Sequence, residues 1–103
     1  LENYTFIFST NGLDGIQKAL HYLPDVIVAN TELPKINGWQ VYQILQKYPS
    51  TEIIPFIFLS ENSNTFELRA AIQRGADDFI TKPIKLKSFL KLIDQYLKQK
   101  YKD

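Results

Sequence analysis

The chain has 103 residues, of which 45% are hydrophobic and 22% are charged, and its formal net charge is +1. This length supports a single hydrophobic core, and the small net charge argues against a general attraction to nucleic acid or to a membrane surface. No apolar run approaches the roughly 20 residues of a membrane-spanning helix, and no signal-peptide pattern is present. We therefore expect one cytoplasmic domain over residues 1–103, in which residues 98–103 begin a linker or tail.

The chain contains no cysteine and one histidine, His21. This composition excludes disulfides, thiolate metal sites and cysteine nucleophiles, and it leaves almost nothing from which to build a histidine metal cluster or a Ser-His-Asp triad. We therefore expect no catalytic residue, no metal site and no cofactor. The sequence begins with Leu1 and contains no Met, which leads us to expect a fragment or a processed form of a longer protein.

The first half of the chain alternates apolar runs with helical periodicity. Residues 4–8 are aromatic and β-branched and predict a first strand. Asn11 and Gly12 predict a turn, and the apolar spacing that follows predicts a helix that Pro24 ends. Residues 26–29 predict a strand that is buried on both faces. A second helix is expected to begin near Gly38.

The second half continues this alternation. Residues 53–59 predict a strand, with Pro55 near its start, where a missing N–H donor is tolerated. The remaining elements are expected as a helix over residues 64–74, a strand over residues 79–81 and a helix from residue 85. Strict alternation of apolar strands with helices predicts an α/β fold, in which a parallel sheet carries helices on both faces.

Polar side chains follow three of the predicted strands. Asn30 comes after the second strand, Ser60 after the third and Lys82 after the fourth. Because functional crevices in parallel α/β sheets lie beyond the carboxyl ends of the strands, these side chains are candidates for a site that binds phosphate or another small anion. The alternative is that Ser60 caps the next segment and Lys82 extends into water.

Three stretches together resemble the receiver domain of two-component response regulators: "PDVIVANTELPKINGWQV", "IIPFIFLSE" and "GADDFITKPI". The resemblance covers most of the chain, and "GADDFITKP" followed by an amphipathic helix is its most specific part. It implies a flavodoxin-like, doubly wound parallel sheet in three α/β/α layers. It also implies a domain that accepts a phosphoryl group from a histidine kinase onto an Asp and then changes its partner binding.

The acceptor position of this family lies four residues before the proline of the following loop. Here Pro34 places that position at Asn30. A carboxylate is a competent nucleophile toward phosphorus, whereas an amide oxygen is a poor one and the amide nitrogen lone pair is delocalised. The resemblance therefore implies a degenerate receiver, a pseudo-receiver.

The other family positions carry over one by one. Ser60 corresponds to the hydroxyl that follows the phosphate, and Lys82, which precedes Pro83, corresponds to the lysine that pairs with the acceptor or its phosphate. Phe79 corresponds to the aromatic side chain that moves during switching. The backbone carbonyl of Glu32 corresponds to a ligand of Mg²⁺, provided that an upstream segment supplies the acidic partners of that site. Since Asn30 removes a negative charge from such a site, Mg²⁺ is expected only if residue 30 is naturally Asp.

The resemblance also implies that the first strand and helix of the family fold are missing. In the family strand order 2-1-3-4-5, the missing strand would lie between residues 4–8 and residues 26–29. Its removal would leave backbone groups unpaired, so either an upstream segment supplies the strand, or these two strands pair directly, or another chain fills the gap. We expect an upstream segment, whose restoration would raise the thermal stability.

Three hypotheses for the function follow. In the first, the chain is a pseudo-receiver in which the Asn30 amide hydrogen-bonds Lys82 and holds one conformation without phosphorylation. In the second, it is an ordinary phosphoacceptor whose Asp was replaced by engineering. In the third, it is an enzyme or a binder of nucleotides or small anions on a flavodoxin-like fold, although no glycine-rich phosphate loop follows a strand.

The last part of the chain is basic. From Lys82 onward there are seven lysines and two aspartates. A solvated helix face explains this excess, and an acidic partner is the alternative. The resemblance places partner binding on the face formed by helix 64–74, strand 78–81 and helix 85–100. The expected partners are a histidine kinase, an output domain or another receiver, including a second copy in a homodimer.

Three smaller features have structural interpretations. Trp39 is expected to be partly buried packing, and Tyr42, on the opposite side of its helix, is a candidate exposed aromatic. The pair Asp77 and Asp78 resembles a carboxylate dyad but precedes a strand, so we expect a solvated turn there.

Overall fold

The computed structural model describes residues 4–60, 69–70, 73 and 75–100. The helices are α1 (Gly12–Tyr22), α2 (Gly38–Leu45), α3 (Pro49–Glu52) and α5 (Leu86–Lys100), and the strands are β1 (Ile27–Asn30), β2 (Phe56–Ser60) and β3 (Asp78–Thr81). Residues 69, 70 and 73 are also helical. None of the helices in the described ranges has the length and apolar content needed to cross a bilayer.

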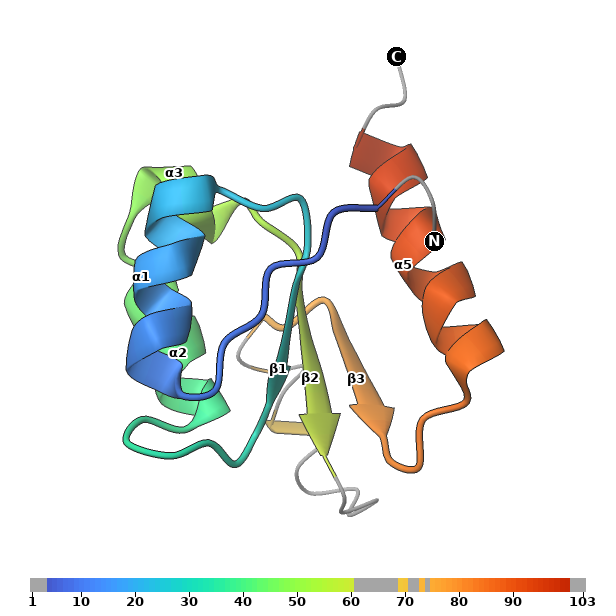
Figure 1. Ribbon diagram of the computed structural model, residues 1–103, viewed down its shortest axis with the longest axis horizontal. Coiled ribbons are helices and arrows are strands. Elements are labelled where there is room, and N and C mark those ends of the chain that lie inside the picture. The colour runs from blue at the N-terminus through green and yellow to red at the C-terminus, as the bar shows by residue number, and fades with distance from the viewer. Residues whose placement is uncertain (1–3, 61–68, 71–72, 74, 101–103) are drawn as a thin grey trace.

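The three strands form one parallel sheet in the order β1-β2-β3. Ile27 pairs with Phe56 at the start of β1, and Ile57 pairs with Asp78 at the start of β3. Helices α1, α2 and α3 lie on one face of the sheet and α5 lies on the other (Figure 1). The prediction of a three-layer α/β fold with a parallel sheet is therefore confirmed.

Asparagine caps and close glycine contacts fix where α1 and α2 begin. The side chain of Asn11 accepts a hydrogen bond from the Asp14 N–H, and Asn37 forms a reciprocal capping box with Gln40. A Cβ atom on Gly38 would lie 2.2 Å from the carbonyl oxygen of Asn30. Glycine is thus required where α2 starts, because the helix backbone touches the end of β1.

Aromatic rings form the centre of the core between the sheet and helices α1 and α2. The Phe58 ring lies 4.3 Å from Trp39 and 5.7 Å from Tyr42, measured between ring centroids. Tyr42 is only 6% exposed, so the expectation of an exposed aromatic was wrong. Its ring fills the space beside Phe56 and Phe58, and a Cβ atom on Gly75 would lie 2.9 Å from its hydroxyl oxygen. Trp39 is partly buried packing, as expected.

The predicted first strand does not form. Residues 4–8 have no regular secondary structure, and Phe6, Ile7 and Phe8 are exposed. A strand is stabilised by pairing with a neighbouring backbone, and this segment has no pairing in the described sheet. Strand propensity alone therefore did not determine the structure here, and the direct pairing of residues 4–8 with residues 26–29 is not formed.

The predicted strand over residues 53–59 begins later than expected. Pro49 starts the short helix α3, and Ile53 ends it with 79% of its surface exposed. The strand β2 begins only at Phe56, after Pro55. The helix predicted over residues 64–74 falls largely outside the described residues, although Gly75 has the positive φ of 91° typical of a helix end.

Candidate functional site

The carboxyl ends of the three strands bring the predicted polar residues to one edge of the sheet. Asn30 is in register with Leu59, and the following Ser60 is in register with Thr81. The Lys82 N–H then donates to the Ser60 carbonyl oxygen at 2.7 Å. Parallel register therefore places the amide of Asn30, the hydroxyl of Ser60 and the backbone of Lys82 at the same end of the sheet. The functions of these three residues stay predictions.

Asn30 is held in a tightly packed position at this end. The next residue, Thr31, is buried, and its N–H donates to the Leu59 carbonyl oxygen while its own carbonyl accepts from the Gly38 N–H. These bonds fold the chain from β1 directly onto α2. The position of the Asn30 backbone is thus fixed by both the sheet and a helix.

The expected hydrogen bond between Asn30 and Lys82 is not formed. A lysine can only donate, so the bond would have to reach Asn30 Oδ1, and this oxygen is buried and accepts no hydrogen bond from the part of the chain that the structure describes. The physical reason is that a neutral amide attracts an ammonium group less strongly than a carboxylate would. The idea that this bond locks the conformation is therefore wrong for the structure.

The loop after β1 contains the other predicted residues. Glu32 and Pro34 are exposed, and the Pro34 carbonyl oxygen accepts from the N–H groups of Ile36 and Gly12. Lys35 has a positive φ of 68°. The loop therefore contacts the start of α1 as well as α2, and it forms the rim of the edge that carries Asn30.

The last two predicted residues lie on and after β3. Phe79 is half-buried and packs against the aromatic core, on the side of the sheet that faces α1 and α2. Its movement during switching stays a prediction. The peptide bond between Lys82 and Pro83 is cis.

The sequence interpretation missed the structural role of Asp77 and Asp78. Asp77 Oδ2 accepts from the Phe56 N–H at 2.7 Å, and the Tyr96 hydroxyl donates to the Asp77 carbonyl oxygen at 3.0 Å. Burial, followed by the nearby charges of Asp78 and Asp77, raises the pKa of Tyr96 to about 12. The two aspartates therefore organise the amino end of the sheet and hold α5. No sequence pattern signalled this long-range contact.

The same amino end carries a shallow groove of about 480 Å³. It is lined by Leu23, Pro24, Ile53, Pro55 and Tyr96, among others. The polar residues at the carboxyl edge and this apolar groove therefore lie at opposite ends of the sheet. The structure does not combine them into one pocket within the described ranges.

The residues at the carboxyl edge are a poor set of ligands for Mg²⁺. Divalent magnesium prefers anionic oxygen ligands, whereas residue 30 offers a neutral amide and Ser60 a hydroxyl. Nowhere in the described part of the chain do three His, Cys, Asp or Glu side chains gather in the geometry of a metal site. The donor set does not fit the metal that the fold implies, so we derive no step through it.

Comparison with known proteins identifies the family. The family described as the response regulator receiver domain matches residues 2–94. The chain belongs to the receiver domain family of response regulators. Response regulator ArlR of Staphylococcus aureus is 34% identical over 98 residues, which are 95% of this chain and 43% of ArlR. The chain thus spans less than half the length of these relatives.

Solved receiver structures support the same assignment. A response regulator from Desulfuromonas acetoxidans is 30% identical, with a TM-score of 0.87 over 97% of this chain and 81% of its own. The receiver domain of the sensor histidine kinase PA1611 from Pseudomonas aeruginosa, with a magnesium ion in its active site cleft, has a TM-score of 0.81 at 19% identity, over 90% of this chain and 76% of its own. The second likeness shows the fold alone. The predicted family and the flavodoxin-like receiver fold are confirmed.

Proposed function

We propose that this receiver is a cytoplasmic signalling module that acts by binding other proteins and does not accept a phosphoryl group. Receiver domains work in two-component systems together with histidine kinases and output domains. The observation that carries the proposal is the neutral amide of Asn30 at the carboxyl end of β1, where the family has its acceptor. Its Oδ1 is buried and accepts no hydrogen bond from the described residues, which supports the proposal.

The chemistry of residue 30 supports the absence of phosphoryl transfer. A phosphoryl group is transferred to a nucleophile that can donate an electron pair to phosphorus, and the lone pairs of an amide are delocalised. The loss of a carboxylate charge also weakens any affinity for Mg²⁺ at this edge. We therefore infer that neither a phosphoryl group nor a metal is needed for the function of the chain, and that the domain is not an enzyme.

The face formed by β3 and α5 supports partner binding. Lys85, Lys87 and Lys91 are exposed on or beside α5, and Leu86 among them is 64% exposed. An exposed apolar side chain between positive charges suits a partner whose surface is acidic with an apolar centre. We infer that a histidine kinase, an output domain or another receiver binds here. Residues 64–68, 71, 72 and 74 of the predicted face lie outside the described residues.

The experiment that tests the proposal is intact-mass spectrometry after incubation with Mg²⁺ and acetyl phosphate. The response regulator from D. acetoxidans serves as the positive control for the phosphodonor. The Asn30→Asp variant of this chain serves as the matched variant, because it restores the carboxylate, which is both the nucleophile and an anionic oxygen ligand for Mg²⁺. Peptide mapping establishes whether residue 30 is Asn or Asp in the native protein.

We expect no phosphoryl adduct on the chain with Asn30. An adduct on that chain at any residue would overturn the proposal. Detection of Asp at residue 30 in the native protein, together with an adduct there, would instead show an ordinary phosphorylation switch whose Asp had been replaced.

A further inference from the structure

The chain contains two Asn-Gly pairs, Asn11-Gly12 and Asn37-Gly38. In each pair the asparagine directly precedes a helix and its side chain caps that helix, α1 in the first pair and α2 in the second. Asparagine followed by glycine is the dipeptide most prone to deamidation, because glycine has no side chain to shield its backbone nitrogen. Two reactive pairs therefore occupy equivalent positions, and their surroundings can be compared directly.

Deamidation begins when the backbone nitrogen of the glycine attacks the side-chain carbon Cγ of the asparagine. A new N–C bond forms, and the side-chain amide nitrogen takes up the proton of the glycine N–H and leaves as ammonia. Water then opens the resulting succinimide ring at either of its carbonyl carbons, which gives aspartate or isoaspartate. The reaction needs no reagent other than water. It does need a glycine N–H that is free and an asparagine that can rotate out of the extended conformation.

The contacts of the Asn37-Gly38 pair oppose this reaction. The Gly38 N–H donates to the Thr31 carbonyl oxygen at 3.0 Å. Asn37 forms two bonds with Gln40, since its Oδ1 accepts from the Gln40 N–H and its own N–H donates to Gln40 Oε1, each at 3.0 Å. Ring closure must therefore break the Gly38 bond and also disrupt the capping box.

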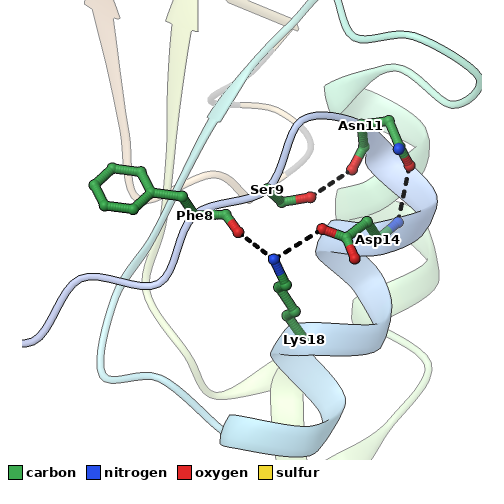
Figure 2. Close-up of polar contacts among 5 residues, drawn as sticks. All are labelled: Phe8, Ser9, Asn11, Asp14 and Lys18. Atoms are coloured by element: carbon green, nitrogen blue, oxygen red, sulfur yellow. Dashed lines mark hydrogen bonds and ion pairs between the residues drawn. The ribbon is translucent and has the colours of Figure 1, made fainter.

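The Asn11-Gly12 pair is held by fewer and longer bonds. Asn11 Oδ1 accepts from the Asp14 N–H at 2.9 Å. The Asp14 side chain, at the position that completes a capping box, is directed toward Lys18 at 3.0 Å (Figure 2). The Gly12 N–H reaches the Pro34 carbonyl oxygen only at 3.4 Å, which is beyond the usual length of such a bond. Less has to be broken before Gly12 can attack.

We propose that the chain deamidates spontaneously at Asn11, and that the contacts at the start of α2 protect Asn37. The two asparagines are equally extended, with ψ of 165° and 171°, so the backbone conformation does not separate them. Asn37 is the more exposed of the two, so exposure alone would predict the opposite order. The rate depends instead on how often each helix start opens locally. The proposal goes beyond the proposed function and does not depend on the chemistry of Asn30.

Isoaspartate at residue 11 would alter the loop beside Asn30. A Cβ atom on Gly12 would lie 2.3 Å from the Ile36 carbonyl oxygen, so the start of α1 and this loop are in close contact. Isoaspartate adds a carbon atom to the main chain and displaces Gly12 from this position. Aspartate leaves the main chain unchanged and keeps an oxygen that can cap the helix. The two products should therefore differ in stability.

The first test follows both sites in one sample by tryptic digestion and mass spectrometry during incubation at mildly alkaline pH. Cleavage at lysine places Asn11 in residues 1–18 and Asn37 in residues 36–47. In urea, where the helices are unfolded, the two rates should be similar. In the folded chain Asn11 should react about tenfold faster, because at least one more hydrogen bond must break at Asn37. Equal rates in the folded chain, or faster reaction of Asn37, would overturn the proposal.

The second test removes the protection at one site. Gln40→Ala deletes the side chain that completes the capping box, and it should raise the rate at Asn37 about threefold to tenfold. The rate at Asn11 should not change. Gln43→Ala is the matched control, because Gln43 is an exposed residue of the same helix outside the box. An equal rise at both asparagines would show that global unfolding limits the reaction, and no rise would show that the box gives no protection. Either result would overturn the proposal.

The third test measures the effect of the products. Chromatography separates chains with isoaspartate at residue 11 from chains with aspartate there. The isoaspartate form should melt about 4–8 °C below the unmodified chain, as expected for the loss of one helix cap, whereas the aspartate form should melt with it. Asn11→Ser keeps a cap oxygen and cannot deamidate, so its melting temperature should stay constant during the same incubation. Equal melting of the two products would overturn the link between residue 11 and the loop.

Discussion

The two faces of the sheet differ in how completely they are packed. On the face toward α1 and α2, Phe56, Phe58 and Leu45 are almost completely buried, and their neighbours interlock around them. On the face toward α5, the helix has apolar residues at half-buried positions, and Leu86 is largely exposed. The exception on this face is Ile57 of β2, which alternates with Phe56 and Phe58 along the strand and is fully buried. Burial therefore depends on which elements are present to cover a face.

The two faces of the sheet should therefore contribute unequally to the free energy of unfolding. The packed face should carry most of the free energy of unfolding, since buried apolar area is the main favourable term. The face toward α5 should contribute less and should tolerate substitution better. The following predictions test this division, beginning with the largest expected effect.

Phe58→Ala should destabilise the domain most. The side chain is fully buried between Trp39, Tyr42 and Phe56, so its removal leaves a cavity in the core. We expect a loss of about 3–5 kcal/mol in the free energy of unfolding, measured by chemical denaturation. Phe8→Ala, at an exposed position, should change it by about 0.5 kcal/mol or less. Equal effects of the two variants would contradict the division between the faces.

Gly38→Ala tests the close approach of α2 to the end of β1. The added Cβ atom would lie 2.2 Å from the Asn30 carbonyl oxygen, and a backbone atom has little freedom to move away. We expect a loss of about 1–3 kcal/mol, as for other overpacked sites. Gly15→Ala is the matched control, because its Cβ atom would meet only the Ser9 side chain at 3.5 Å or more.

The control should change stability in the opposite direction. Gly15 lies inside α1, where alanine is favoured over glycine by about 0.5–1 kcal/mol. Thermal melting of the two variants would therefore show one shift down and one shift up. A neutral Gly38→Ala would mean that α2 can move away from β1 at no cost.

Tyr96→Phe tests the attachment of α5 to the sheet. The variant loses the hydrogen bond to the Asp77 carbonyl oxygen, with an expected cost of about 0.5–1.5 kcal/mol near neutral pH. Because the pKa of Tyr96 is raised from 10.0 to about 12, its contribution is fully present below pH 10.0 and is lost as the pH rises toward about 12.

Denaturation at a series of alkaline pH values measures this loss. The stability of the unmodified chain should fall between these two pH values more steeply than that of Tyr96→Phe. Tyr22→Phe, at an exposed position, serves as the control and should follow the unmodified chain. Parallel curves for all three proteins would show that the Tyr96 hydroxyl does not hold α5.

The contacts of the Asp94 carboxylate should contribute least to the stability of the domain. The hydrogen bond from Lys98, followed by the one from Tyr4, lowers the pKa of this carboxyl from its usual 3.8. Its contribution to stability is therefore present above pH 3.8 and is lost as the pH falls through the lowered value. An NMR titration of the carboxyl carbon should give a midpoint below 3.8, and Lys98→Ala should raise it. An unchanged midpoint in that variant would show that the ion pair is not formed in solution.

The sequence correctly predicted those helices and strands whose apolar spacing matches the way they pack in the structure. Helix α1 and strand β1 follow directly from apolar spacing, although Gly12, expected in a turn, is the first residue of the helix. The prediction of a strand over residues 4–8 was wrong although the strand propensity of this segment is strong. A strand needs a neighbouring strand to pair with, and the described sheet does not provide one. The prediction that Tyr42 is exposed was wrong for a related reason. The periodicity of a helix does not reveal which of its faces the rest of the structure will cover.

The candidate site was predictable in position and not in detail. Asn30, Ser60 and Lys82 follow consecutive parallel strands, so topology alone brings them to one edge. Whether the Asn30 amide finds a donor depends on side-chain geometry, which the sequence does not encode in a local pattern. The contacts of Asp77 with β2 and α5 join residues 19 to 21 positions apart and were likewise invisible.

The position of the single tryptophan gives the domain an internal optical probe. Trp39 follows Gly38, whose backbone touches the Asn30 carbonyl, and its indole ring lies against Phe58 in the core. We therefore expect a displacement of the residue 30 backbone to shift the start of α2 and to change the surroundings of the indole. The fluorescence of the unlabelled protein should report on events at the carboxyl edge of the sheet, whether a partner arrives there or the acceptor side chain is restored.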